Sequence, residues 1–140
     1  MRNLPIGALS DQTGVKVPTI RYYEQVGLIP PAARTGGNRR TYDTDDVSRL
    51  WFIRHARELG FEVEAIRQLL ELTDKPERPC AEADTIARVH LRDIDSKIAR
   101  LTALRSEVRR MTDECAHGRV GDCRVIQVLA DHGQCEHQQH

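Results

Sequence analysis

Apolar residues recur at helical spacing along an uninterrupted run from residue 81 to residue 114. The steps between them are three or four residues, which places them on one face of a helix with nearly heptad spacing. Charged side chains occupy the other faces, and neither Gly nor Pro interrupts the run. The pattern predicts one helix of about 34 residues, roughly 50 Å long. Its apolar stripe consists of Ala87, Leu91, Ile94, Ile98, Leu101, Leu104, Val108, Met111 and Cys115.

A solvated helix of this length needs a partner for its apolar stripe, because so much exposed hydrocarbon is unfavourable in water. The simplest partner is a second copy of the same helix, which predicts an antiparallel or parallel homodimer. The alternative is that the helix folds back onto its own N-terminal domain. Residues 1–72 have enough apolar positions to fill a core of their own, so the pattern favours the dimer.

Two short helices are predicted near the N-terminus. The first, Ile6–Gln12, is ended by Gly14, and the second, Pro18–Val26, has proline in its first turn and Gly27 after its end. Two short helices joined by a turn that contains Gly are typical of the helix-turn-helix motif. The second helix carries side chains suited to phosphate and base-edge contacts, namely Thr19, Arg21, Tyr22 and Tyr23.

The next segment, Leu28–Tyr42, has the pattern of a small β-hairpin. Pro30-Pro31 excludes a helix, and Gly36-Gly37-Asn38 favours a tight turn. Basic residues interleaved with tyrosine beside a helix-turn-helix indicate a DNA-binding wing, while the alternative is an exposed, solvated turn. The residues near the tip and on the return strand are Arg34, Arg39, Arg40 and Tyr42.

Two further helices are predicted before the long one. Asp43 can cap a helix that runs to about Leu59, and Glu62–Thr73 forms the next. Residues 74–80 contain two prolines and alternating charges, which makes them an extended, stiff hinge. The side chains expected to face the core are Val47, Leu50, Trp51 and Ile53 in the first helix and Val63, Ile66, Leu69 and Leu70 in the second.

The composition permits nucleic-acid binding without requiring it. The chain has 21 basic and 21 acidic side chains, but residues 1–60 hold 9 and 6 of them, which leaves a mildly basic N-terminal half. No stretch is long and apolar enough to span a membrane, and the N-terminus does not resemble a signal peptide. We therefore expect a cytoplasmic protein, whose four cysteines are metal or redox ligands rather than a disulfide framework.

The cysteines bracket the long helix. Cys80 precedes it, and Cys115 and Cys123 follow it in a segment whose two glycines let the chain turn so that the two thiols converge. A short helix, Val125–Ala130, is expected to close this loop before a polar, mobile tail. His117 is a plausible extra ligand for zinc, and the tail offers a weaker second site formed by Cys135, His137 and His140. His55, His90 and His132 are expected to be ordinary helix or surface residues.

Four motifs closely resemble the MerR family of bacterial transcription regulators, and the resemblance covers nearly the whole chain. They are Thr19-Ile20-Arg21-Tyr22-Tyr23-Glu24, Gly27-Leu28, Asn38-Arg39-Arg40-Thr41-Tyr42 and Phe52-Ile53-Arg54-His55-Ala56-Arg57-Glu58-Leu59-Gly60-Phe61. The resemblance implies a homodimer whose long helices pair antiparallel. Such a dimer binds a near-palindromic operator in a promoter with an overlong spacer, and distorts that DNA when an effector binds so that RNA polymerase can start.

The implied architecture is mainly α-helical and has five parts. A winged helix-turn-helix DNA-binding domain comprises residues 1–73, and a hinge comprises residues 74–80. An antiparallel coiled-coil dimerisation helix follows over residues 81–114, then a metal-binding loop with a short helix over 115–132, and a flexible tail over 133–140. The family's DNA-contacting positions that match this sequence are Arg21, Tyr22, Arg34, Arg40, Tyr42 and Arg57. A contact at Pro18 is doubtful, because family members often have a polar residue there.

The resemblance also implies the kind of effector. Cys115 and Cys123 match the two loop cysteines of the metal-sensing branch, and Cys80 matches the third cysteine of its divalent sensors for mercury, zinc, cadmium and lead. In an antiparallel dimer, Cys80 of one chain would lie near the loop of the other. A third thiolate suits a soft divalent ion, whereas two thiolates already balance the charge of copper(I).

Three other readings remain open from the sequence. One is a copper(I) sensor of the same family, in which Cys80 is incidental. A zinc enzyme is the second, although no His-Glu-x-x-His or similar motif is present to hold a catalytic zinc. The third is a redox switch that uses an iron–sulfur cluster or a disulfide, although the family's iron–sulfur members carry a denser group of cysteines in this loop. We therefore expect a metal-responsive regulator and no enzymatic activity.

Overall fold

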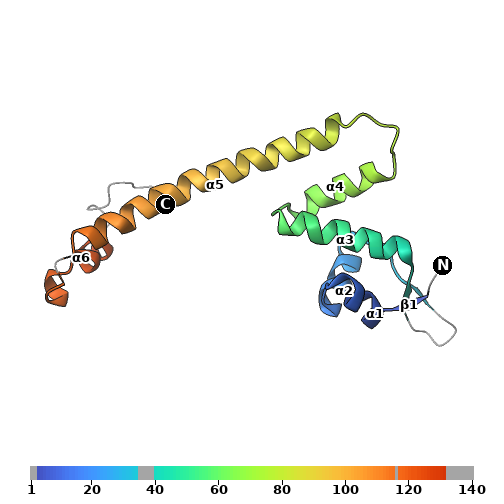
Figure 1. The fold of residues 1–140 in the computed structure, drawn as a ribbon, viewed down its shortest axis with the longest axis horizontal. Coiled ribbons are helices and arrows are strands. Elements are labelled where there is room, and N and C mark those ends of the chain that lie inside the picture. The colour runs from blue at the N-terminus through green and yellow to red at the C-terminus, as the bar shows by residue number, and fades with distance from the viewer. Residues whose placement is uncertain (1–2, 35–39, 116, 132–140) are drawn as a thin grey trace. The chain divides into compact units, whose positions relative to one another are not determined.

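The computed structural model describes residues 3–34, 40–115 and 117–131, and only the backbone of Arg40 (Figure 1). Contacts divide the chain into two compact units, Met1–Ile86 and Ala87–His140. The fold is mainly α-helical, with a small antiparallel sheet and one long helix, as the sequence predicts. In the described part of the chain, the helices are too short or too polar to cross a membrane.

The first unit opens with the two helices of the predicted helix-turn-helix. Helix α1 comprises Ile6–Thr13 and ends at Gly14, whose φ of 71° is left-handed and whose N–H donates to the Ser10 carbonyl at 2.8 Å. Helix α2 comprises Val17–Gln25 and has proline in its first turn, where a missing N–H costs nothing. Both helices lie within one residue of their predicted bounds.

A three-stranded antiparallel sheet forms the wing. Strand β1 (Leu4–Pro5) pairs with β3 (Arg40–Tyr42), which also pairs with β2 (Ala33–Arg34), so the order is β1-β3-β2. Leu4 lies opposite Tyr42, and Ala33 lies opposite Thr41. The predicted hairpin is therefore present, and β1 is an additional strand that the sequence did not indicate.

Two helices follow the wing and contribute to the core of the first unit. Helix α3 (Thr44–Glu58) starts with a capping box, in which Asp43 accepts from the Asp46 N–H at 3.1 Å and Asp46 accepts from the Asp43 N–H at 3.0 Å. Helix α4 comprises Val63–Thr73. Buried side chains from the helices and the wing form one core, which consists of Leu9, Val15, Ile20, Tyr23, Leu28, Ile29, Tyr42, Leu50, Ile53, Ala56, Ile66 and Leu70.

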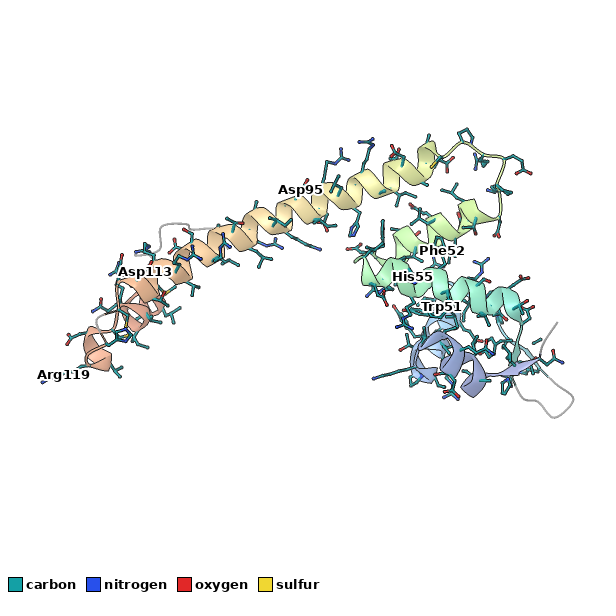
Figure 2. All side chains as sticks on the ribbon, in the orientation of Figure 1. Trp51, Phe52, His55, Asp95, Asp113 and Arg119 are labelled. Atoms are coloured by element: carbon teal, nitrogen blue, oxygen red, sulfur yellow. The ribbon has the colours of Figure 1, made fainter. Side chains whose placement is uncertain are left out.

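The prediction that Trp51 faces this core is wrong. Its side chain is 37% exposed, whereas its neighbour Phe52 packs against the core. Trp51 and His55 lie on the surface of α3 with 5.6 Å between their ring centroids (Figure 2). The Arg54 guanidinium lies 5.3 Å from the centroid of the Trp51 ring. These two contacts give the indole polar and cationic neighbours, so it can remain at the surface.

The long helix α5 comprises Ala81–Asp113, which confirms the predicted run to within one residue. It begins in the first unit and continues through the second. A 3-10 turn, η1 (Val120–Asp122), and a short helix, α6 (Arg124–Ala130), follow it. Within the second unit, Glu107, Met111 and Val128 are buried. Most of the predicted stripe is exposed in this single chain, including Leu91, Ile98, Leu101 and Val108.

Candidate functional site

Helix α2 presents one face to the core and another to solvent. Ile20 and Tyr23 are buried, while Arg21 is exposed and Tyr22 is 47% exposed. Thr19, earlier on the helix, is half-buried. A guanidinium and a phenol side by side on an open helix face can reach phosphate oxygens and base edges. Of the four candidates on this helix, the structure therefore leaves Arg21 and Tyr22 best placed for DNA.

Two tyrosines predicted to contact DNA are core residues instead. Tyr23 is 8% exposed, and Tyr42 is 2% exposed. The Tyr42 hydroxyl donates a hydrogen bond to Glu24 Oε1 at 2.6 Å, which ties the wing to α2. Both rings belong to the core of the first unit, so a direct DNA contact by either ring is not supported by this structure.

The structure places two of the three basic residues predicted in the wing. Arg34 is exposed on β2, next to the wing tip. Arg40 begins β3, where its backbone pairs with that of Arg34. Arg39 lies outside the described residues. The register therefore brings Arg34 and Arg40 to the same level of the hairpin, next to each other on adjacent strands.

Arg57 lies exposed on α3, and its Nη1 donates to the carbonyl oxygen of Phe61 at 3.0 Å. This bond spans the turn between α3 and α4 and holds the guanidinium near that turn. Four further donor positions of the planar guanidinium remain suited to other acceptors. A phosphate contact by Arg57 stays a prediction.

Sequence reasoning missed Arg54, which joins α3 to the turn of the helix-turn-helix. Its Nη1 donates to the Thr13 carbonyl at 2.5 Å. Gly14 leaves room for this approach: a Cβ there would lie 2.3 Å from the same nitrogen, so the end of the Arg54 side chain would have to shift. Thr13 and Arg54 are 41 residues apart, so helical periodicity could not have revealed the contact.

Cys115 and Cys123 come together at the end of α5. The Cys115 thiol is near enough to Cys123 to contribute by hydrogen bonding to the pKa of that thiol. The backbone N–H of Ile126, joined by that of Val125 and by the Cys115 thiol, lowers the pKa of Cys123 below its ordinary value. Partial burial opposes this shift without reversing it. A thiolate favoured in this way is a better ligand for soft metal ions, because fewer protons compete for it.

Cys80 lies at the opposite end of α5. It is exposed, and its carbonyl accepts from the Asp84 N–H at 2.9 Å, so it starts the helix. Its side chain borders a mainly apolar cavity of about 290 Å³, lined also by Phe52, Leu69, Leu72, Pro76, Pro79 and Ala83. The 33 residues of α5 and then Glu114 separate Cys80 from Cys115. Among the described residues, no three Cys, His, Asp or Glu side chains of one chain gather into a group that could hold a metal ion.

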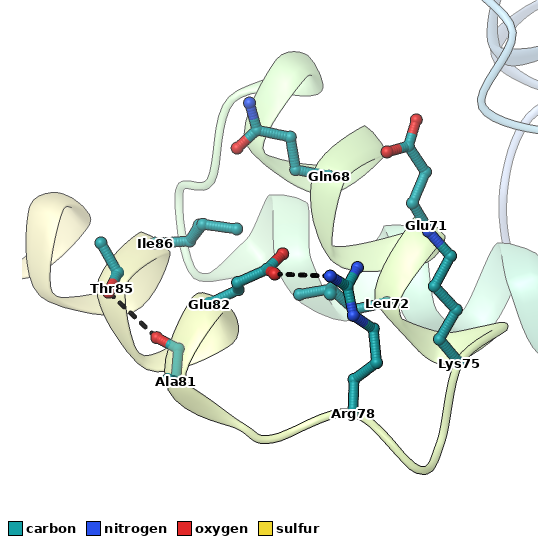
Figure 3. Close-up of a pocket in the computed structure, with 9 residues that line it drawn as sticks. All are labelled: Gln68, Glu71, Leu72, Lys75, Arg78, Ala81, Glu82, Thr85 and Ile86. Carbon is teal, nitrogen blue, oxygen red and sulfur yellow. Dashed lines mark hydrogen bonds and ion pairs between the residues drawn. The ribbon is translucent and has the colours of Figure 1, made fainter.

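A second, more polar cavity of about 420 Å³ lies between α4, the turn that follows it and the first turns of α5 (Figure 3). Glu71 and Lys75 border it from α4 and the turn, and Arg78 and Glu82 form an ion pair of 3.4 Å beside it. This pair joins the hinge to the first turn of α5. It therefore helps to fix the segment on which Cys80 sits.

Among the described residues, no further predicted ligand joins the two loop cysteines in a group that could hold a metal ion. His117 is exposed and has a left-handed backbone, with φ of 56°, which is uncommon for a residue other than Gly or Asn. Cys135, His137 and His140 lie outside the described residues. Their part in a metal site stays a prediction.

Two family descriptions match the chain. The description "MerR HTH family regulatory protein" matches residues 4–73, and "MerR, DNA binding" matches residues 47–111. The first covers both helices of the helix-turn-helix, the wing, α3 and α4. The second runs on through most of α5.

Individual relatives are similar over most of their length. HTH-type transcriptional regulator HmrR of Sinorhizobium medicae is 39% identical over 128 residues, which is 91% of this chain and 87% of that protein. HTH-type transcriptional regulator ZntR of Escherichia coli K12 is 38% identical over 128 residues, or 89% and 90% of the two chains. The structure is also similar to the crystal structure of the transcription regulator PbrR691 from Ralstonia metallidurans CH34 in complex with lead(II), with a TM-score of 0.79. That match covers 92% of this chain and 98% of the other, and the two sequences are 36% identical.

These matches agree with the geometry described above. The helix-turn-helix, its wing and the long helix occur in one order, and an identity of 36–39% extends over about nine-tenths of the chain. The matching family consists of DNA-binding regulators and not of enzymes. The chain therefore belongs to the MerR family of helix-turn-helix transcription regulators.

Proposed function

We propose that this protein is a homodimeric, metal-responsive transcription activator. The dimer binds a promoter operator and, when loaded with a soft divalent ion such as cadmium, lead, zinc or mercury, distorts the DNA so that RNA polymerase can start transcription of metal-resistance genes. It acts in the cytoplasm, where the promoter is. The observation that carries the proposal is the meeting of the Cys115 and Cys123 thiols beyond α5, with the pKa of Cys123 lowered.

The exposed stripe on α5 supports the dimer. Leu91 is 54% exposed, Ile98 56% and Leu101 64%, although each is a large apolar side chain. An apolar stripe at heptad spacing is suited to packing against a second helix. Antiparallel pairing of two copies of α5 brings the start of one helix to the end of the other.

That pairing also accounts for the separation of the three cysteines. Cys80 starts α5, and Cys115 and Cys123 follow its end. In an antiparallel dimer, Cys80 of one protomer completes the site begun by the partner's loop. The dimer then holds two such sites, each of which depends on both chains, so occupancy is coupled to the geometry of the dimer.

The chemistry of three thiolates favours soft ions. Thiolate sulfur binds cadmium, lead, mercury and zinc more readily than it binds hard ions such as magnesium. Zinc is suited better if a nitrogen ligand joins the thiolates, and His117 follows Cys115 closely enough to be tested for that role. Among the relatives, PbrR691 was crystallised in complex with lead(II), which supports a site of this type.

The same dimer presents two DNA-binding domains. Arg21 and Tyr22 of α2 are proposed to enter the major groove, and Arg34 and Arg40 of the wing to contact flanking phosphates. Thr19, Arg39 and Arg57 are proposed as additional backbone contacts. Tyr23 and Tyr42 hold this surface together from the core.

Run-off transcription from the cognate promoter tests the proposal. Zinc, cadmium, lead, mercury and copper(I) are titrated against the wild type and Cys80→Ser, with promoter binding of both apo proteins measured alongside. Activation by a divalent ion, lost in Cys80→Ser while apo binding is unchanged, is the expected result. An unchanged divalent response in Cys80→Ser would refute the three-thiolate site.

A copper(I) sensor is the second candidate, and one observation favours it. Only two of the cysteine thiols meet within the described part of one chain, and two thiolates suffice for linear coordination of copper(I). Activation by copper(I) alone, equal in wild type and Cys80→Ser, would support this reading.

A further inference from the structure

A chain of ion pairs joins the end of α5 to the start of α6. Glu114 Oε2 lies 2.6 Å from Arg124 Nε, and Glu114 Oε1 lies 3.7 Å from Arg110 Nη1. Arg110 Nη2 in turn lies 2.9 Å from Glu107 Oε2. Of these four residues, Glu107 and Arg110 lie in the last turns of α5, and Glu114 follows its end. Arg124 is the first residue of α6.

Three of these four charged side chains are partly or fully shielded from solvent. The Glu107 side chain is 3% exposed, Arg110 23% and Arg124 28%, whereas Glu114 is 43% exposed. By comparison, the Asp93–Lys97 pair on α5 has both side chains more than half exposed. Partly buried cations are screened less by water and salt, so Arg110 and Arg124 attract the Glu114 carboxylate more strongly than a fully solvated cation would.

The pair between Glu114 and Arg124 brackets the two thiols. Glu114 directly precedes Cys115, and Arg124 directly follows Cys123. The ion pair between these two residues, with 2.6 Å between Glu114 Oε2 and Arg124 Nε, holds the two ends of the loop together. Arg110, which contacts both Glu107 and Glu114, fixes the carboxylate from the α5 side.

We infer that Glu114 and Arg124 form a clamp that positions Cys115 and Cys123 next to each other before any ion binds. The inference rests on the proposed function of these cysteines as ligands. Both clamp residues are positioning residues, which act through the loop backbone. Because two acidic and two basic side chains balance, the chain of ion pairs adds no net charge beside the thiolates.

The clamp is tested without metal, through the tendency of the two thiols to pair. All variants are made in the full-length chain with Cys80→Ser and Cys135→Ser, so that Cys115 and Cys123 are the remaining thiols. The protein is equilibrated with reduced and oxidised glutathione. Two protein thiols reduce one glutathione disulfide, which yields one protein disulfide and two reduced glutathiones. The equilibrium constant gives the effective concentration of one thiol at the other.

The expected result is a loss in each single variant and no further loss when both are combined. Glu114→Gln and Arg124→Gln should each lower the effective concentration by about tenfold, the size expected for one partly buried ion pair. The double variant Glu114→Gln with Arg124→Gln should be impaired no more than either single variant, because both residues act through the same pair. The matched control, Asp93→Asn with Lys97→Gln, removes an exposed pair of α5 and should change nothing. Far-UV circular dichroism checks that each variant is folded.

Two results would overturn the clamp. In the first, the single variants keep the wild-type effective concentration. In the second, the losses of the two single variants multiply in the double variant, which would mean that each residue acts alone. Because no metal enters this measurement, its failure is distinct from failure of metal activation. Cadmium affinity, measured against a chelator in the chain with native cysteines, should fall in the same order as the thiol pairing.

Discussion

The guanidinium of Arg54 connects α3 to the end of α1. It donates to the Thr13 carbonyl at the end of α1, lies over the Trp51 ring, and pairs with Glu58 at 3.1 Å. The carbonyl it satisfies lies at the turn that sets the direction of α2. The orientation of the recognition helix therefore depends on a side chain that need not touch DNA.

Gly14 makes that contact possible, which leads to a prediction. Gly14→Ala should destabilise the protein by about 1–3 kcal/mol, because φ of 71° strains an L-residue and the new Cβ would meet Arg54 at 2.3 Å. Gly7→Ala is the matched control: it lies within α1 and meets nothing within 4 Å, so it should be neutral or stabilising by up to about 1 kcal/mol. Urea unfolding measures both. Equal stability of the two variants would contradict the role of Gly14.

At the same scale, the sequence predicted residue types better than residue positions. Arg21 and Tyr22 are exposed as expected, but Tyr23 is buried, because it follows Ile20 by three residues on the same helix face. Tyr42 was predicted to contact DNA from its basic neighbours, yet it pairs with Leu4 across the sheet and is 2% exposed. Helix periodicity could have identified Tyr23 as a core residue, whereas Tyr42 depended on a strand pairing that was not anticipated.

At the scale of elements, local signals defined the helices well. Asp43, Gly14 and the prolines mark helix ends that agree with the structure to within about a residue, because capping and φ restriction act locally. Strand β1 escaped prediction, since Leu4–Pro5 is too short to show alternation. Trp51 was placed inward by its apolar character, but the core side of α3 was already filled by Leu50 and Ile53.

The stripe of α5 makes a prediction at this scale. Leu101→Lys should weaken or abolish the homodimer, because it puts a charge into an apolar stripe where the side chain is now 64% exposed in the single chain. Thr102→Lys is the matched control, since it adds the same charge at the next exposed position, outside the stripe. Analytical ultracentrifugation reports the dissociation of each variant. A Leu101→Lys dimer as stable as wild type would argue against pairing through this stripe.

At the scale of the whole molecule, the proposed metal site is divided between the two ends of α5. The sequence showed that three cysteines bracket the long helix, and the structure brings two of their thiols together. The structure of a single chain could not show Cys80 joining them, because the long helix separates Cys80 from the loop within one chain. The central claim is therefore that a second protomer supplies Cys80.

A mixed dimer tests this claim most directly. One protomer carries Cys80→Ser and the other carries Cys115→Ser with Cys123→Ser, each with its own affinity tag for purification of the heterodimer. If the site is shared, the heterodimer has one intact site, formed by Cys115 and Cys123 of the first protomer and Cys80 of the second. Neither homodimer has an intact site. We predict one cadmium ion per heterodimer, with wild-type affinity, and none bound tightly by either homodimer. A heterodimer that binds no more tightly than the homodimers would contradict a site shared between chains.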